Sequence, residues 1–157
     1  MPSKTQSILL GGAIVGVLSP LIALIPVVGG CISCFGYTIA GLVAVWHFTS
    51  THELTIAGGS GAGMGALAGI VTALIGGAVS YVLVELGIAP GMDQVMEGLA
   101  ESGAMDDDQL EEIADFIYSP VAYLAFMGVG AIFGAILGAI GGAIGASVFK
   151  KGGEFPS

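Results

Sequence analysis

The stretch that decides the fold runs from Gly128 to Lys151 and reads GVGAIFGAILGAIGGAIGASVFKK. It is uncharged until its final lysine pair, and an apolar run of this length is long enough to cross the roughly 30 Å hydrocarbon core of a bilayer as a helix. Glycine inside a helix costs about 1 kcal/mol relative to alanine, yet it recurs at 130, 134, 138 and 142. We therefore expect a membrane span whose glycines have a packing role.

The composition of the whole chain agrees with a membrane environment. Of 157 residues, 55% are hydrophobic and only 10% are charged, which is too little charge to cover the surface of a soluble protein. The net charge is −9 and Lys and Arg together number 3, so a nucleic-acid partner is excluded because few phosphates could be neutralised. We predict one all-α integral membrane domain over residues 1–157, with the lipid bilayer as its surroundings.

The apolar blocks predict four transmembrane helices arranged as two hairpins. Residues 8–48 contain no Asp, Glu, Lys or Arg and are twice as long as one span needs, and Pro26 with Gly29 and Gly30 supplies a tight turn between two helices. A polar connection at 49–55 precedes the third helix. The predicted spans are approximately 8–25, 31–48, 62–86 and 121–149.

The lysines predict the orientation. Lys4 precedes the first span, and Lys150 and Lys151 follow the fourth, and basic residues near span ends favour the cytoplasmic side. We therefore expect a protein of the cell (cytoplasmic) membrane with both termini in the cytoplasm. The segment between the third and fourth spans then lies outside.

That segment, 91–119, holds most of the acidic residues and predicts an amphipathic helical pair. Asp93 is positioned to cap a short helix that ends at Gly103, and a second helix carries apolar residues at spacings of three and four from 110 to 117. We expect these helices to pack over the bundle. The acidic run 106–112 lacks the alternating ligands and central glycine of a calcium loop, so a solvated helix start is the preferred interpretation over a cation site.

Cys31 and Cys34 are candidates for redox or metal chemistry, because they share one helical face near a helix start, where the pKa of a thiol falls. A metal would need further ligands, and His47 lies about 24 Å along the same helix. Packing of two small residues is therefore the preferred interpretation, and we predict no metal.

His47 and His52 lie at the predicted cytoplasmic interface, and Glu85 adjoins the third span. These three residues are the candidate groups of an ion pathway, because an ionisable residue in a span is a functional candidate. Ordinary polar residues of a connection or an interface are the alternative. The sequence contains no recognisable catalytic set. We accordingly predict neither an enzyme nor a cofactor.

Small residues recur every four positions on all four predicted spans, a GxxxG or glycine-zipper pattern that lets helix backbones approach closely. The predicted packing residues are Gly12, Gly16, Gly61, Gly65, Gly69, Gly77, Gly130, Gly134, Gly138 and Gly142. So many strips exceed what one helix pair requires. We expect the surplus to serve a homo-oligomer or contacts within a larger membrane complex.

Two groups of residues resemble a family. Gly12, Gly16, Pro26, Gly29 and Gly30 form the first group, and Gly61, Ala62, Gly65, Ala66, Ala68 and Gly69 form the second. In these features the first 80 residues resemble a loose group of small, glycine-rich, four-span prokaryotic membrane proteins of archaeal type, with no known activity. The long acidic segment departs from the short loop of that group. The resemblance implies the four-span fold and nothing about chemistry.

The sequence thus favours a non-catalytic membrane protein that acts as a close-packed assembly or accessory component. The alternative is a small channel or transporter for ions or solutes. A thiol redox or metal-handling role ranks third.

Overall fold

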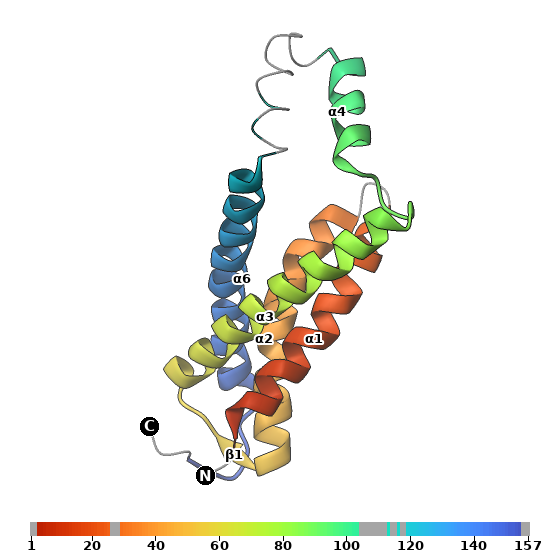
Figure 1. Ribbon diagram of the computed structural model, residues 1–157. Coiled ribbons are helices and arrows are strands. Elements are labelled where there is room, and N and C mark those ends of the chain that lie inside the picture. Colours follow the sequence, from red (N-terminus) through yellow and green to blue (C-terminus); the bar gives the residue numbers. More distant parts are fainter. Residues whose placement is uncertain (1–2, 26–28, 104–112, 114–115, 117–118, 155–157) are drawn as a thin grey trace.

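The computed structural model describes residues 3–25, 29–103, 113, 116 and 119–154, and this part of the chain is mostly helical. In chain order its elements are α1 (Lys4–Ala23), α2 (Gly29–His52), β1 (Leu54–Thr55), α3 (Gly58–Glu85), α4 (Met92–Glu101), α6 (Pro120–Val148) and β2 (Gly153–Glu154) (Figure 1). Among the described residues, three helical segments are long and apolar enough to cross a membrane, namely Lys4–Ala23, Gly58–Glu85 and Leu124–Val148.

The four long helices α1, α2, α3 and α6 form one bundle (Figure 1). Helix α1 packs against α2 and α3, and α6 packs against the same two helices. Ser7 at the start of α1 meets His47 near the end of α2, so these neighbours run in opposite directions. The starts of α1 and α3 and the ends of α2 and α6 therefore lie together, and we call this the lysine end. The opposite end, where α3 leads into α4, is called the acidic end.

Helices α3 and α6 meet backbone to backbone. Gly65 on α3 faces Gly138 and Gly142 on α6, and Gly69 faces Gly134. A Cβ added at Gly61 would lie 2.5 Å from the carbonyl oxygen of Gly142, closer than real Cβ atoms approach. Glycine is needed at this contact because any side chain would hold the two backbones apart.

The interior of the bundle is built mainly from small residues, and the large apolar side chains point outward. Ala40, Ala44 and Ala68 have no exposed surface, and Phe48 is the largest fully buried side chain in the part of the chain that the structure describes. In contrast, isoleucines on the outer side of α6 are about half exposed, such as Ile136 at 54%. This distribution reverses that of a soluble protein and leaves a broad apolar surface around the bundle.

The connection after α2 differs from the polar loop predicted at 49–55. Helix α2 continues to His52. Thr49 is fully buried, and its hydroxyl donates to the carbonyl oxygens of Val45 and Trp46. The hydroxyl thus finds its hydrogen-bond acceptors within its own helix, which allows this polar residue to be buried. The chain turns only at Glu53, whose φ is +51°.

A two-stranded clasp closes the lysine end. Strand β1 pairs in parallel with β2, and the Thr55 hydroxyl donates to the carbonyl oxygen of Lys151 at 2.9 Å. Gly152 has φ +55°, and a Cβ there would overlap the carbonyl oxygen of Glu53. The clasp ties the start of α3 to the end of α6.

The prediction for the acidic segment is corrected in two respects. Helix α4 has Gly91 at its N-cap with no side-chain cap, so Asp93 lies in the first turn and does not cap the helix. In the described part of the chain α4 projects from the acidic end and does not pack across the four long helices (Figure 1). The predicted second helix over 110–117 lies outside the described residues, apart from Ile113 and Phe116.

Candidate functional site: a cavity between the long helices

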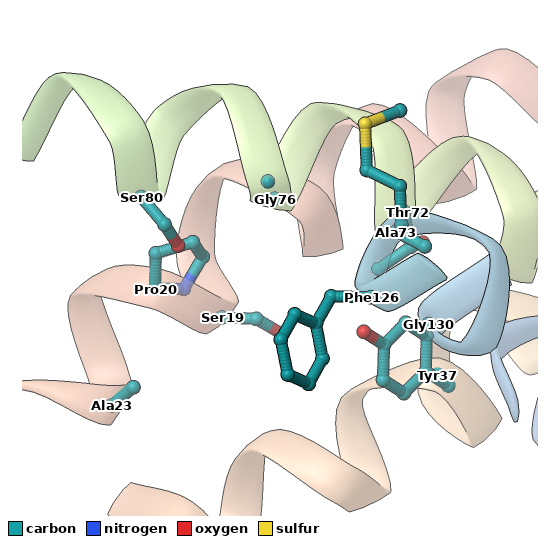
Figure 2. A pocket seen from close by; sticks show the side chains of 12 residues that line it. Ser19, Pro20, Ala23, Tyr37, Thr72, Ala73, Gly76, Ser80, Phe126 and Gly130 are labelled. Carbon is teal, nitrogen blue, oxygen red and sulfur yellow. The ribbon is translucent and has the colours of Figure 1, made fainter. Parts of the chain in front are cut away.

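A cavity of about 500 Å³ lies between the long helices, on the side of the bundle toward the acidic end. All four long helices contribute to its wall, and α3 contributes most. The lining residues are Ser19, Pro20, Ala23, Tyr37, Thr72, Ala73, Gly76, Gly77, Ser80, Phe126, Met127 and Gly130 (Figure 2). The volume is in the range of small-molecule sites, which commonly lie between the helices of bundles.

The cavity begins where the glycine contact of α3 with α6 ends. Gly69 and Gly134 are the last pair in direct backbone contact, whereas a Cβ added at Gly77 or Gly130 would meet nothing within 4 Å. Both glycines were predicted to pack against another helix. From Gly134 toward the acidic end, α6 separates from α3. Small residues at the lysine end therefore close the bundle, whereas small residues on the acidic side of Gly134 leave an open space (Figure 1).

Thr72 forms the floor of the cavity and joins two helices. Its side chain is 2% exposed, and its hydroxyl lies 2.9 Å from the carbonyl oxygen of Ala68 and 3.3 Å from that of Gly12. Gly12 is on α1, so this hydroxyl bridges α1 and α3. Every fully buried side-chain nitrogen or oxygen among the described residues has a partner, as an apolar environment requires.

Pro20 shapes the α1 wall. Proline has no backbone N–H, so the carbonyl of Gly16 lacks its usual helical donor at this point. A Cβ added at Gly76 would lie 3.5 Å from that carbonyl oxygen, so α3 passes close to it. This is an ordinary van der Waals distance, so α3 can approach α1 beside the interrupted turn even with a Cβ at this position.

The chemistry of the wall is mainly hydrocarbon with a few hydroxyl groups. Ser19, Tyr37 and Ser80 bring hydroxyls from three helices, and Figure 2 shows the Phe126 ring directed between the Ser19 and Tyr37 side chains. None of the lining residues carries a charge. Such a wall suits a neutral, largely apolar molecule and offers no counter-charge to an ion.

The candidate ion-pathway residues are not brought together. His47 lies near the lysine end, with its Nδ1 2.9 Å from the Ser7 hydroxyl, and His52 contacts Phe48 edge to face at 4.9 Å between ring centroids. Glu85 ends α3 at the acidic end and is exposed. None of the three lines the cavity.

The cysteine hypothesis falls on side chains outside the described part of the chain. The backbone of Cys31 and Cys34 belongs to the first turns of α2, at the acidic end. Among the described residues, no three His, Cys, Asp or Glu side chains gather in a way that could hold a metal ion.

The other predicted packing glycines lie at contacts between helices of the same chain. Gly12 contacts Val71 and Gly16 contacts Ile75, so the α1 strip faces α3. The α6 strip faces α3 as described above. Apart from Gly77 and Gly130, these glycines thus lie at contacts within the chain, and the predicted homo-oligomer stays a prediction.

Several residues of the site were missed from the sequence. The hydroxyl residues Ser19, Tyr37, Thr72 and Ser80 were not singled out, although hydroxyls within apolar spans were a usable signal. Packing glycines outside the four-residue strips were missed as well. Gly141 meets the backbone of Thr38 and Gly41 meets that of Gly138, and both contacts join α2 to α6.

Comparison of the chain with family models, with curated proteins and with solved structures found no match. Functional inference therefore depends on the bundle, the cavity and their chemistry.

Proposed function

We propose that the chain is a four-span membrane protein in which α1, α2, α3 and α6 all cross the bilayer as two hairpins. Helix α2 is 24 residues long, which exceeds the roughly 20 residues that a span requires. The outward apolar side chains on the long helices support lipid contact. With the three lysines at one end, the lysine end is cytoplasmic and the acidic end lies outside.

Within the membrane, its proposed role is that of a non-catalytic, close-packed assembly or accessory component. The observation that carries this proposal is the backbone contact of α3 with α6, which makes the half of the bundle toward the lysine end a closed unit. Such a unit gives a rigid support and presents apolar helix faces to neighbouring chains. Homo-oligomerisation is part of the proposal, with its interface on these outer faces.

Extraction in a mild detergent followed by native mass spectrometry tests the role. We expect a discrete complex larger than one chain, containing copies of this chain or additional subunits. A single chain without protein partners, found both in the detergent extract and in native membrane particles, contradicts the assembly role.

Transport of a small solute is a second candidate, favoured by the cavity. It requires the closed half of the bundle to open, since Ala40, Ala44 and Ala68 fill the path toward the lysine end without exposed surface. A flux assay in liposomes, with protons, monovalent cations and glycerol as test solutes, separates the two roles. Flux above protein-free liposomes that falls on Gly77→Leu, which adds a side chain at the cavity wall, supports transport through the cavity, and absence of flux contradicts it.

Cysteine accessibility tests the topology independently of the role. In a chain with Cys31→Ser and Cys34→Ser, a cysteine at Ala100 on α4 is expected to react with an impermeant thiol reagent added outside intact cells. A cysteine at Lys151 is expected to react only after the membrane is permeabilised. The reverse pattern overturns the orientation.

A further inference from the structure

We infer that the cavity between the long helices binds one hydrocarbon chain of a membrane lipid, which enters sideways from the bilayer. The inference rests on the proposed membrane placement, and goes beyond it by assigning a ligand to the cavity. Depth, wall chemistry and the position of the mouth carry it.

The depth of the cavity places it within the hydrocarbon layer. On α3 its lining residues extend from Thr72 to Ser80, which is about 21 to 33 Å from the start of the helix at about 1.5 Å per residue. A hydrocarbon core of roughly 30 Å centred on α3 covers this interval. The cavity then occupies the half of that core toward the acidic end, where lipid chains are the surrounding solvent.

The wall favours a lipid chain over water. Its lining is mostly carbon, and the hydroxyl of Thr72 already donates to backbone carbonyl oxygens. A bound water needs two to four polar partners, which a wall made mostly of carbon offers poorly. Protein interiors also rarely leave a space of this size unfilled, so an apolar occupant is expected. Engineered apolar cavities of about 150 Å³ take up benzene, so a site of about 500 Å³ is large enough for an extended stretch of hydrocarbon chain.

The mouth of the cavity lies on the outer surface of the bundle. Phe126 and Met127 line the cavity and are also 56% and 41% exposed, so the same α6 turn faces both the cavity and the surroundings. Leu74 on α3 is likewise 48% exposed and belongs to the apolar outer surface. A lipid hydrocarbon chain that enters past α6 thus moves from the apolar bilayer core into an apolar cavity and crosses no polar barrier.

Photolabelling provides the test. The full chain is reconstituted in phosphatidylcholine vesicles that contain a phosphatidylcholine with a diazirine in the middle of one acyl chain, and labelled peptides are mapped by mass spectrometry. Labelling is expected on the α3 residues that line the cavity, which are Thr72, Ala73, Gly76, Gly77 and Ser80. Labelling around Ile136, on the outer surface of α6, reports membrane placement separately.

The matched variants add bulk either at the cavity wall or away from it. Gly77→Leu and Gly130→Leu add a side chain at the wall, and Gly63→Leu and Gly128→Leu are their controls on the same two helices. An added Cβ meets nothing within 4 Å at any of the four positions. We expect the wall variants to lower labelling of the α3 cavity segment about tenfold, equivalent to roughly 1.4 kcal/mol of binding, and the controls to leave it unchanged.

A water-filled cavity is the competing outcome. In the cysteine-free background, Ala73→Cys is expected to resist an impermeant thiol reagent, whereas Ala100→Cys on α4 reacts. Rapid modification at Ala73, or labelling of the outer surface without labelling of the cavity, overturns the lipid-chain assignment. Absence of labelling on the outer surface as well overturns the membrane placement itself. Two wall positions keep the test valid if one of the variants does not fold.

Discussion

Alanine at Gly138 should destabilise the bundle although it favours the helix that carries it. The added Cβ would overlap the carbonyl oxygen of Gly65 and lie 3.0 Å from its carbonyl carbon and 3.1 Å from the Cα of Gly69. These atoms belong to the backbone of α3 and cannot rotate away, so the two helices must separate. A radial gap of about 0.5–1 Å forfeits a quarter to a half of each dispersion contact along the strip.

The magnitude follows from two opposing effects. Overpacking of this kind costs about 1–3 kcal/mol, and alanine recovers up to about 1 kcal/mol of helix propensity relative to glycine. Gly128→Ala on the same helix has only the second effect, because an added Cβ there meets nothing within 4 Å. The free energy of unfolding of Gly138→Ala should therefore lie about 1–3 kcal/mol below that of Gly128→Ala.

The assay is unfolding in mixed micelles with an increasing fraction of sodium dodecyl sulfate, followed by circular dichroism. Gly65→Ala and the double variant complete a cycle with Gly138→Ala. Once one methyl has separated the helices the second costs less, so the double variant should be more stable than the sum of the single changes predicts. Equal stability of Gly138→Ala and Gly128→Ala would refute the reasoning.

The contact of α3 with α6 also determines the expected effect of larger side chains at Gly134 and Gly138. If the strip of α6 formed an oligomer interface, Gly134→Leu with Gly138→Leu would convert an oligomer into folded single chains. Because these glycines face α3 of the same chain, we expect loss of the folded chain instead. A folded single chain with unchanged circular dichroism would show instead that the strip of α6 forms the interface between chains.

Three other changes test separate contacts, the first two by the same unfolding assay and the third by proteolysis. Thr72→Val removes the hydroxyl that bridges α1 and α3 and should cost about 0.5–1.5 kcal/mol, whereas Ser147→Ala, which loses only an exposed bond within α6, should change stability little. Ser7→Ala removes the hydrogen-bond partner of His47 and should lower the free energy of unfolding by about 1 kcal/mol. An unchanged free energy would show that this bond makes no net contribution. Gly152→Ala combines an unfavourable positive φ with a backbone overlap, so Gly153 and Glu154 of β2 should become accessible to carboxypeptidase. Gly58→Ala, at an open position, should leave them protected, and equal digestion of both variants would contradict the clasp.

The apolar helices followed from the sequence because their signal is local. Block length and the absence of charge predicted α1, α3 and α6 to within a few residues, and the four-residue spacing of glycine marked positions where helices approach, except at Gly77 and Gly130. The partner of each strip did not follow from that spacing. A strip of small residues indicates that another helix approaches closely. Whether that helix belongs to the same chain depends on how the four helices are arranged.

The cavity and the end of α2 depended on tertiary structure. The cavity exists because α6 diverges from α3 beyond Gly134, an angle that no single-helix pattern encodes. The polar residues from Thr49 to His52 resembled a connection by composition. They are helical because Thr49 bonds to its own helix and packs inside the bundle.

The glycine contact between α3 and α6 also has an entropic consequence. Burying a side chain normally costs rotamer freedom, and this cost is zero for glycine. Two helices already formed in a bilayer keep their internal hydrogen bonds when they associate, so the strips from Gly61 to Gly69 and from Gly134 to Gly142 meet as two fixed surfaces with no rotamers to freeze. The same surfaces have no alternative side-chain conformations with which to absorb a misfit. The pairing is therefore low in ordering cost, and a side chain added along either strip has no room in which to adjust.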